Sequence, residues 1–537
     1  MMPSGSIQPD AVIVGSGVNS LACAALLARA GWGVHVLERN DYLGGAVKTA
    51  ELAVPGFLHD VFSGWHSAWL AGRAHAALAG ELAGHGLEYL NTDLPAATVF
   101  PDGSAAFLLR TPEQTAAEFE RHAAADGAAW LAFVGARARS AGVVRDLTQR
   151  DLGLLSGSAS ALRARRQLGA AGFLELSASL VGSSRDWLCG TFASEQVRGV
   201  LAPWALHAGL GPDAAGSAFV TQLLVLGKQR VGSPIPKGGG SRLVAALAGV
   251  AERHGGRLDV SQDVERILVS GSRAVGVRVA GGRTVLARRA VVCNVTPTQL
   301  YGRLLVEPRP ELAAAAKRYR YGLADMQIHY ALSKPASWSG DERLNGTAVI
   351  HVTGGLDAIS KAVNEAQRGL LPAEPTIVVG QHLTVDSSRA PAGAGMLWVQ
   401  IVELPWLVRG DAAGTIDVGD GTWSDSLREH YAQRVHEQLR RHIANLDSVT
   451  LARTALSPAD LQAANVNLVR GDPYSGSMTP DQSLFLRPFA RNAGHRTGID
   501  RLWHIGASSH PGPGVSGASG FLAAGALTRS RSRRLRR

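Results

Sequence analysis

The chain has 537 residues, of which 46 % are hydrophobic and 18 % are charged, so it is long enough for two or more domains with a large buried core. This balance excludes a disordered chain. The formal net charge is +10, but six arginines belong to the C-terminal sequence RSRSRRLRR, so the rest of the chain is only mildly basic. We therefore expect a basic, disordered tail over residues 529–537 and no nucleic-acid partner.

The cysteines and the apolar segments restrict the location and the chemistry. Cys23, Cys189 and Cys293 are widely spaced, which argues against a disulfide framework and against a CxxC metal or redox motif. No HExxH or DxDxDG motif occurs, so we expect no metal. Because the sequence shows neither a signal peptide nor a window of about 18 apolar residues, we expect a cytoplasmic protein that does not span a membrane.

Residues 11–38 follow the order strand, glycine-rich turn, helix and strand, which is typical of a dinucleotide-binding βαβ unit. Gly15 permits the tight turn, and Gly17 lets the backbone approach a pyrophosphate at the N-terminus of the helix. Ser20 stands where a third glycine is usual, and we expect its hydroxyl to bond to backbone or phosphate. Glu38 ends the second strand, where an acid accepts from ribose hydroxyls and repels a 2′-phosphate. The unit therefore predicts a dinucleotide other than NADP.

The stretch after Glu38 favours FAD over NAD. The pair Gly44-Gly45 in ERNDYLGGAVKT gives the backbone a second approach to a long dinucleotide. The C-terminal sequence HIGASSHPGPGVSGASGFLAAGAL predicts a strand, a glycine-rich turn and a helix that begins near Val515. Free N–H groups at that helix start would stabilise an anionic group, such as a reduced flavin if the loop lies beside one. No second GxGxxG precedes a helix, so we expect no built-in NAD(P)H domain.

The order of patterns predicts a discontinuous α/β chain. Alanine-, leucine- and arginine-rich helical patterns fill residues 70–230 without comparable strand alternation, whereas residues 257–294 contain three β-rich runs of a meander and then a further buried strand. We expect a Rossmann-like FAD-binding domain of the glutathione-reductase type, with a β-meander, and a discontinuous α+β substrate or cap domain. The FAD-binding parts are residues 8–70, 232–300 and 490–528, and the substrate parts are residues 71–231, which we expect to be helical, and 301–489.

The two end motifs, VIVGSGVNSLACAALLARAGWGVHVLERNDYLGG and HIGASSHPGPGVSGASGFLAAGAL, together resemble the phytoene desaturase-like branch of the flavin amine oxidase superfamily. The likeness continues at FASEQVRGVLAPWALHAGLGPDAAGSAFV, DSSRAPAGAG and MTPDQSLFLRP, and so covers most of the chain. The sequence departs from that pattern at Ser20, at Ala46, where many relatives have arginine, and at HDVFSG over 59–64.

The resemblance implies which residues bind FAD and which face the substrate. The residues on FAD-binding positions are Gly15, Gly17, Ser20, Glu38, Arg39, Gly44, Gly45, Val264, Gly506, Gly514, Val515 and Ser516. Trp65 and His66 follow the glycine pair closely, and we expect them to line the substrate face of the flavin. We expect His510 in ASSHPG to position the C-terminal loop or to touch the flavin, rather than to belong to a serine triad, whose members converge through the fold.

These features predict an FAD-dependent dehydrogenase or desaturase that removes hydride from a largely apolar, polyene- or carotenoid-like small molecule and passes electrons to oxygen or a quinone. Interleaved apolar residues and arginines over residues 130–180 are more typical of a solvated arginine-rich face, with contact with a membrane surface as the alternative. Two enzyme alternatives are a flavin amine oxidase and a redox-neutral isomerase. A third alternative is a binding protein that lost the flavin, as in Rab GDP-dissociation inhibitors, although both flavin-facing glycine loops are retained here. The sequence indicates no oligomeric state.

Overall fold

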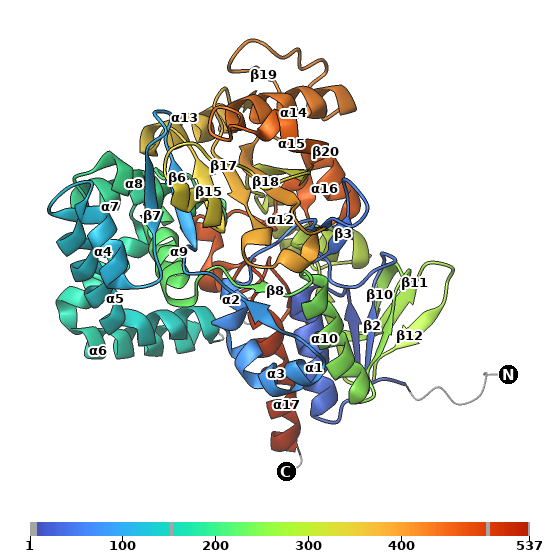
Figure 1. Cartoon of the computed structure of the whole chain (residues 1–537). Helices are drawn as coiled ribbons and strands as arrows, with labels where there is room; N and C mark the ends of the chain where they lie inside the picture. Colours follow the sequence, from blue (N-terminus) through green and yellow to red (C-terminus); the bar gives the residue numbers. More distant parts are fainter. Residues whose placement is uncertain (1–7, 151–153, 490–494, 535–537) are drawn as a thin grey trace.

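A five-stranded parallel sheet forms one half of the molecule, with the strand order β21-β13-β1-β2-β9. The computed structural model describes residues 8–150, 154–489 and 495–534. The strands are β1 (Ala11–Val14), β2 (Val34–Leu37), β9 (Arg257–Asp259), β13 (Ala290–Asn294) and β21 (Leu502–Ile505). Three distant parts of the sequence therefore meet in one sheet, and the prediction of a Rossmann-like α/β fold is confirmed (Figure 1).

Both faces of this sheet are covered by other elements. Adjacent residues of a strand point to opposite faces, so one strand contacts both layers. Ala11 and Ile13 pack against helices, whereas Val12 and Val14 pack against an antiparallel meander. The helices are α1 (Val18–Arg29), α10 (Ser241–Arg253) and α17 (Ala518–Arg534). The strands of the meander are β10 (Val264–Ser270), β11 (Arg273–Val279) and β12 (Thr284–Leu286). The continuous apolar run AVIV is what such a two-sided burial requires.

A second sheet of seven strands has the order β20-β14-β18-β17-β15-β6-β7. Its strands are β6 (Ala96–Val99), β7 (Ala105–Leu108), β14 (Ala324–Leu332), β15 (Val349–Val352), β17 (Ile377–Gly380), β18 (Gly395–Leu404) and β20 (Thr450–Leu456). The expectation that residues 71–231 are helical throughout is therefore wrong at β6 and β7. Their sequences AATV and AAFL are rich in alanine, a helix former. They are strands because β6 pairs with β15, and β7 pairs with β6, which overrides that local preference.

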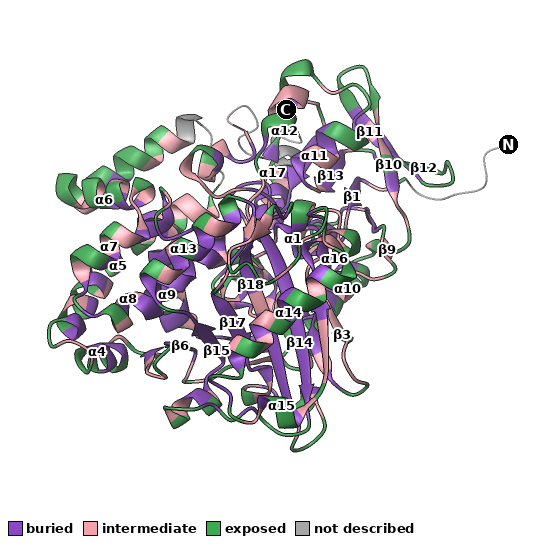
Figure 2. Ribbon diagram, turned by 90° about the horizontal axis from the view of Figure 1, so that it is seen from above, coloured by how far each residue is buried: buried purple, intermediate pink, exposed green. Residues whose placement is uncertain are grey.

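Helices lie beside this second sheet and share a core with β6 and β7, except the longest of them, which packs on neighbouring helices instead. They are α4 (Pro112–Glu120), α5 (Asp126–Gln149), α6 (Leu154–Val181), α7 (Ser184–Thr191), α8 (Glu195–Leu201) and α9 (Ser217–Val231). Figure 2 shows α6 at the periphery with long exposed stretches, whereas β14, β17 and β18 are buried at the centre. α9 packs against both α6 and the 3₁₀ helix over 202–208, so it lies between the outer helices and the interior.

Short elements complete the chain. The small strands are β3 (Thr49–Glu51) with β4 (Leu58–Asp60), β5 (Tyr89–Leu90) with β8 (Ile235–Pro236), and β16 (Leu370–Leu371) with β19 (Gly410–Asp411). The remaining helices are α2 (Ser67–Leu70), α3 (Arg73–Gly84), α11 (Pro297–Gln299), α12 (Pro310–Arg318), α13 (Leu356–Gln367), α14 (Asp425–Leu439), α15 (Leu446–Val449) and α16 (Pro458–Ala464).

The C-terminal helix differs from expectation at both ends. α17 begins at Ala518 rather than near Val515, because the positive φ of Gly517 keeps the glycine-rich turn going until that point. It extends to Arg534 and so includes residues 529–534 of the segment expected to be disordered, while residues 535–537 lie outside the described residues. Within residues 8–150, 154–489 and 495–534, no helix has both the length and the apolar character needed to cross a lipid bilayer.

Candidate functional site

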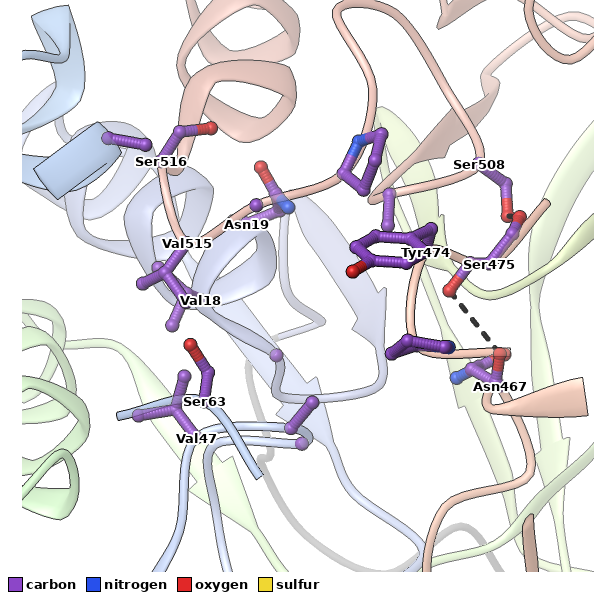
Figure 3. A pocket seen from close by; sticks show the side chains of 18 of the residues that line it. Val18, Asn19, Val47, Ser63, Asn467, Tyr474, Ser475, Ser508, Val515 and Ser516 are labelled. Carbon is purple, nitrogen blue, oxygen red and sulfur yellow. Dashed lines mark hydrogen bonds between the residues drawn. The ribbon is translucent and has the colours of Figure 1, made fainter. Parts of the chain in front are cut away.

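A cavity of about 810 Å³ lies where the carboxyl ends of β1, β2 and β13 face the seven-stranded sheet. Val14, Leu37 and Asn294, the last residues of these strands, line it. Crevices outside the carboxyl ends of parallel strands are the usual dinucleotide sites of such sheets. In Figure 3, Val18, Val47 and Val515 lie on one side of the cavity, and Tyr474, Ser475 and Ser508 lie on the other.

The first glycine loop is joined to the glycine pair through Ser16. Glu38 Oε2 accepts hydrogen bonds from both the backbone N–H and the hydroxyl of Ser16, each at 2.8 Å, and Glu38 Oε1 accepts from the backbone N–H of Asn40 at 2.9 Å. Ser16 Oγ in turn accepts from the Gly44 N–H at 3.0 Å. Glu38 also lines the cavity, and a carboxylate has about four lone-pair positions, so it retains capacity for a ribose hydroxyl.

The glycines are required by close backbone contacts as well as by the cavity. A Cβ on Gly45 would lie 3.2 Å from the Gly17 Cα, and a Cβ on Gly44, whose φ is +116°, would collide with the carbonyl oxygen of Val47. By contrast, a Cβ on Gly514, with φ +112°, would meet no atom within 4 Å, so that backbone borders open space. Gly44 and Gly45 thus allow their loop to pack against the loop that contains Gly17. Gly514 leaves room for a group at the C-terminal loop. This arrangement fits an extended dinucleotide such as FAD.

Most of the residues expected to bind FAD line this one cavity. They are Gly15, Gly17, Glu38, Arg39, Gly44, Gly45, Val264, Gly514, Val515 and Ser516. The N-terminus of α1 borders the same space, and within the described residues no side chain caps it, so its N–H groups suit a phosphate.

Ser20 and Gly506 do not line the cavity. Ser20 is buried on α1, and its hydroxyl has no hydrogen-bond partner among the described residues, so the expected bond to backbone is not formed. The position tolerates serine because it is a packing position. Gly506 N–H donates to Ser519 Oγ at 3.0 Å, and a Cβ on Gly506 would collide with the side chain of Asn294. Gly506 therefore leaves room for the side chain of Asn294, a cavity-lining residue that the sequence pattern did not indicate.

Trp65 and His66 are adjacent but face different surroundings. Trp65 lines the cavity, and its indole stacks on the ring of His382 with centroids 4.6 Å apart and an interplanar angle of 12°. His66 is fully buried, shares a hydrogen bond of 2.9 Å with the Tyr89 hydroxyl and does not line the cavity. Burial lowers the pKa of His66 to about 4, so its ring is neutral. The structure brings only Trp65 to the cavity.

His510 also lies outside the cavity lining. Its Nε2 donates to the carbonyl oxygen of Arg150 at 2.8 Å, and its own carbonyl oxygen accepts from His495 Nε2 at 2.8 Å. Burial lowers the pKa of His510 to about 4. Of the two expected roles, these contacts favour positioning of the C-terminal loop.

Lys228, on the inner face of α9, is a cavity residue that the sequence analysis missed. It is only 7 % exposed, and its Nζ donates to Ser233 Oγ at 2.9 Å. The same nitrogen lies 5.4 Å from the ring centroid of Trp65 and 5.2 Å from that of Trp204. Burial lowers the pKa of Lys228 to about 7. The sequence feature that could have indicated Lys228 is its spacing of four residues from Leu224 and eight from Val220, which places a lysine on an apolar helical face.

Asp325, Gln327 and Gln400 form a second polar group in the cavity wall, on β14 and β18. Asp325 Oδ2 accepts from Gln327 Nε2 at 2.8 Å and from Gln400 Nε2 at 2.9 Å. Burial raises the pKa of Asp325 to about 8, so the side chain is mostly uncharged at neutral pH. The sequence pattern did not indicate these residues, because polar residues at i and i+2 of a strand are typical of a solvent-facing edge.

Comparison with known proteins identifies the family. The family model described as flavin containing amine oxidoreductase matches residues 21–527. The chain is 25 % identical to pyridine nucleotide-disulfide oxidoreductase domain-containing protein 2 of Rattus norvegicus, over 97 % of this chain and 94 % of that protein. It is 27 % identical to hydroxyneurosporene desaturase of Cereibacter sphaeroides, over 95 % of both chains.

A solved structure supports the same fold. Cyclohexylamine oxidase from Brevibacterium oxydans matches with a TM-score of 0.61 and 16 % identity, over 98 % of this chain and all of the other. The suspected resemblance is therefore confirmed: the chain belongs to the flavin containing amine oxidoreductase family and is an FAD-dependent oxidoreductase.

Proposed function

We propose that the chain is a dehydrogenase or desaturase for a largely apolar small molecule, with oxygen or a quinone as the electron acceptor. The observation that carries this proposal is one continuous cavity, which extends from the dinucleotide loops to an apolar wall on α9. The residues of that wall are Phe219, Val220, Leu223, Leu224 and Val231. Such a wall excludes water from the place where a C–H bond is broken.

The bound cofactor supplies the redox chemistry, because FAD accepts a hydride and later releases the electrons. The chain's own residues bind the cofactor and orient the substrate. Gly15 and Gly17 bring backbone N–H groups to the pyrophosphate, Glu38 holds the ribose, and Gly514 leaves space at the C-terminal loop. Trp65, held against His382, is the aromatic wall that we propose to position the substrate.

Amine oxidation is the second candidate, because cyclohexylamine oxidase shares the fold. The charges in the cavity argue against it. Asp325 is mostly uncharged at neutral pH, and Lys228, with a pKa of about 7, offers no negative charge and in its protonated form repels an ammonium group. We therefore favour a substrate without a cationic nitrogen.

We also propose that the substrate enters from a membrane surface. Val181, Leu223 and Phe485 line the cavity and are 62 %, 39 % and 41 % exposed, which leaves an apolar rim at the surface. Arg163, on the neighbouring α6, could contact anionic lipid. We further propose a division into two domains. Residues 8–70, 232–300 and 490–528 act as the FAD-binding domain, and the intervening segments act as the substrate domain.

The test is anaerobic reduction of the flavin in the purified holoenzyme by a panel of polyenes, hydroxy compounds and amines. We expect bleaching of the visible flavin bands by apolar compounds that can lose two hydrogens. Bleaching by amines alone would favour the oxidase, and bleaching by NAD(P)H alone would favour a reductase. A purified protein without flavin absorbance would refute the enzyme assignment.

A further inference from the structure

Lys228 is a buried amine, about half protonated at neutral pH because burial lowers its pKa to about 7, and the hydrogen-bonding capacity of its ammonium form is only partly used. An ammonium group has three N–H donors, and one of them bonds to Ser233 Oγ. Ser233 in turn donates to the carbonyl oxygen of Pro95 at 2.8 Å, which fixes the position of the lysine head. The rings of Trp65 and Trp204 lie near the ammonium, and they offer a weaker attraction than an anion.

The surroundings contain no charge that balances this cation. Within the described residues, no carboxylate forms an ion pair with Lys228, and burial is the cause that lowers its pKa. His207 lines the same cavity, but burial lowers its pKa to about 3, so it is neutral. Asp325, on the seven-stranded sheet, is mostly uncharged at neutral pH. A buried cation without a counter-ion is costly, and a ligand anion would remove that cost.

The face of α9 in front of Lys228 is apolar and leads to the surface. Val220, Leu224 and Lys228 are spaced by four residues, so they lie one above another on the helix. Val220 and Leu224 are half-buried and Lys228 is only 7 % exposed, whereas Leu223, which also lines the cavity, is 39 % exposed at the surface. A molecule that entered from the rim would therefore place its far end at the lysine and its apolar body along the helix.

We propose that Lys228 binds the carboxylate of an amphiphilic substrate whose apolar part lies along α9. This proposal rests on the proposed function, and it specifies the substrate class of the same cavity as an apolar chain with one acidic end. A single ammonium with Ser233 beside it suits a monoanion, because a phosphate dianion usually requires several cations or a bidentate arginine.

The experiment measures binding to the oxidised holoenzyme without turnover, so it is independent of whether any compound reduces the flavin. The probes are dodecanoate, dodecan-1-ol and dodecylamine, which share one chain length and differ in the head group. Binding is followed at neutral pH by quenching of tryptophan fluorescence and by the shift of the visible flavin bands.

We expect the native protein to bind dodecanoate about tenfold more tightly than dodecanol, and dodecylamine most weakly. Lys228→Met should remove the preference for the carboxylate and leave dodecanol binding within about twofold. The matched control is Lys237→Met, because Lys237 is half exposed in an ion pair with Glu88 and does not line the cavity. Equal binding of dodecanoate and dodecanol by the native protein, or a preference that survives in Lys228→Met, would overturn the proposal.

A second measurement uses the native protein, in case the variant does not fold. A bound carboxylate keeps Lys228 protonated and covered, so dodecanoate should protect it from acylation by acetic anhydride. Labelling at each lysine is read by peptide mass spectrometry. We expect protection of Lys228 by dodecanoate and not by dodecanol, with Lys237 labelled equally in every sample. Labelling of Lys228 that dodecanoate does not reduce would count against the proposal.

Discussion

Asp60 and Arg389 form a fully buried ion pair, with Arg389 Nη1 donating to Asp60 Oδ2 at 2.6 Å, although 329 residues separate them. Asp60 Oδ1 also accepts from the backbone N–H of Gly240 at 2.8 Å, and Arg389 donates to the carbonyl oxygen of Pro236 at 2.9 Å. The pair thus joins β4, the segment before α10 and the 3₁₀ helix over 387–389. Trp65 lies five residues after Asp60, the last residue of β4, so this network anchors the start of the segment that carries Trp65 to the cavity.

Arg389→Met should destabilise the protein strongly, because it leaves the Asp60 carboxylate buried without its counter-ion. We expect a loss of about 3–5 kcal/mol in the free energy of unfolding. The double variant Asp60→Asn with Arg389→Met should recover part of that loss. Denaturant unfolding measures both changes. Lys237→Met, which breaks an exposed pair, should cost less than about 1 kcal/mol, and a similar cost for Arg389→Met would contradict the buried role.

Gly44→Ala should lower both flavin content and stability. The added Cβ would collide with the Val47 carbonyl oxygen at a positive φ, so the second loop must move away from the first. We expect a cost of about 1–3 kcal/mol and a purified protein depleted in flavin. Absorbance of the flavin per chain is the measurement. Gly80→Ala in α3 is the matched control, because its Cβ would meet no atom within 4 Å and should stabilise the helix.

Asp325→Asn should change how stability depends on pH. The folded-state pKa of Asp325 is raised from 3.8 to about 8 by burial, so between these values the folded protein holds a proton that the unfolded chain releases. Stability should therefore fall as pH rises from about 4 to 8, and it should fall less in the variant, which cannot ionise. Thermal melting at pH 5 and pH 8 tests this. Identical pH dependence in the two proteins would show that Asp325 ionises normally.

Trp65→Leu and His66→Gln should separate catalysis from packing. Trp65 lines the cavity, so the leucine variant should retain flavin but lose at least about tenfold in kcat/KM through misplaced substrate. His66 contacts Tyr89 instead, so the glutamine variant should cost about 1 kcal/mol of stability and reduce flavin at the native rate. Stopped-flow reduction and unfolding curves give both values. A slower reduction in His66→Gln at unchanged stability would return His66 to the catalytic site.

Local patterns of the sequence determined the nucleotide half of the protein. The run AVIV, the turn with Gly15 and Gly17 and the acid at Glu38 predict a βαβ unit, because strand burial, positive φ and helix N-terminal N–H groups are properties of a few adjacent residues. The glycine pair and the C-terminal turn were predicted from local patterns as well. The family resemblance added the individual FAD-binding positions, most of which line the cavity.

Only the tertiary structure decided the substrate half. Lys228, Asp325 and Gln400 belong to one helix and two strands that are far apart in the chain, and their chemistry follows from shared burial rather than from spacing. The fold likewise turned His66 to Tyr89 while Trp65 faced the cavity. The sequence by itself determines local features, such as a buried strand, a glycine turn or a helix start, because each depends on a few neighbouring residues. The packing of distant segments decides which side chains meet in one desolvated space. For this reason the substrate wall could not be predicted from the sequence, whereas the cofactor loops could.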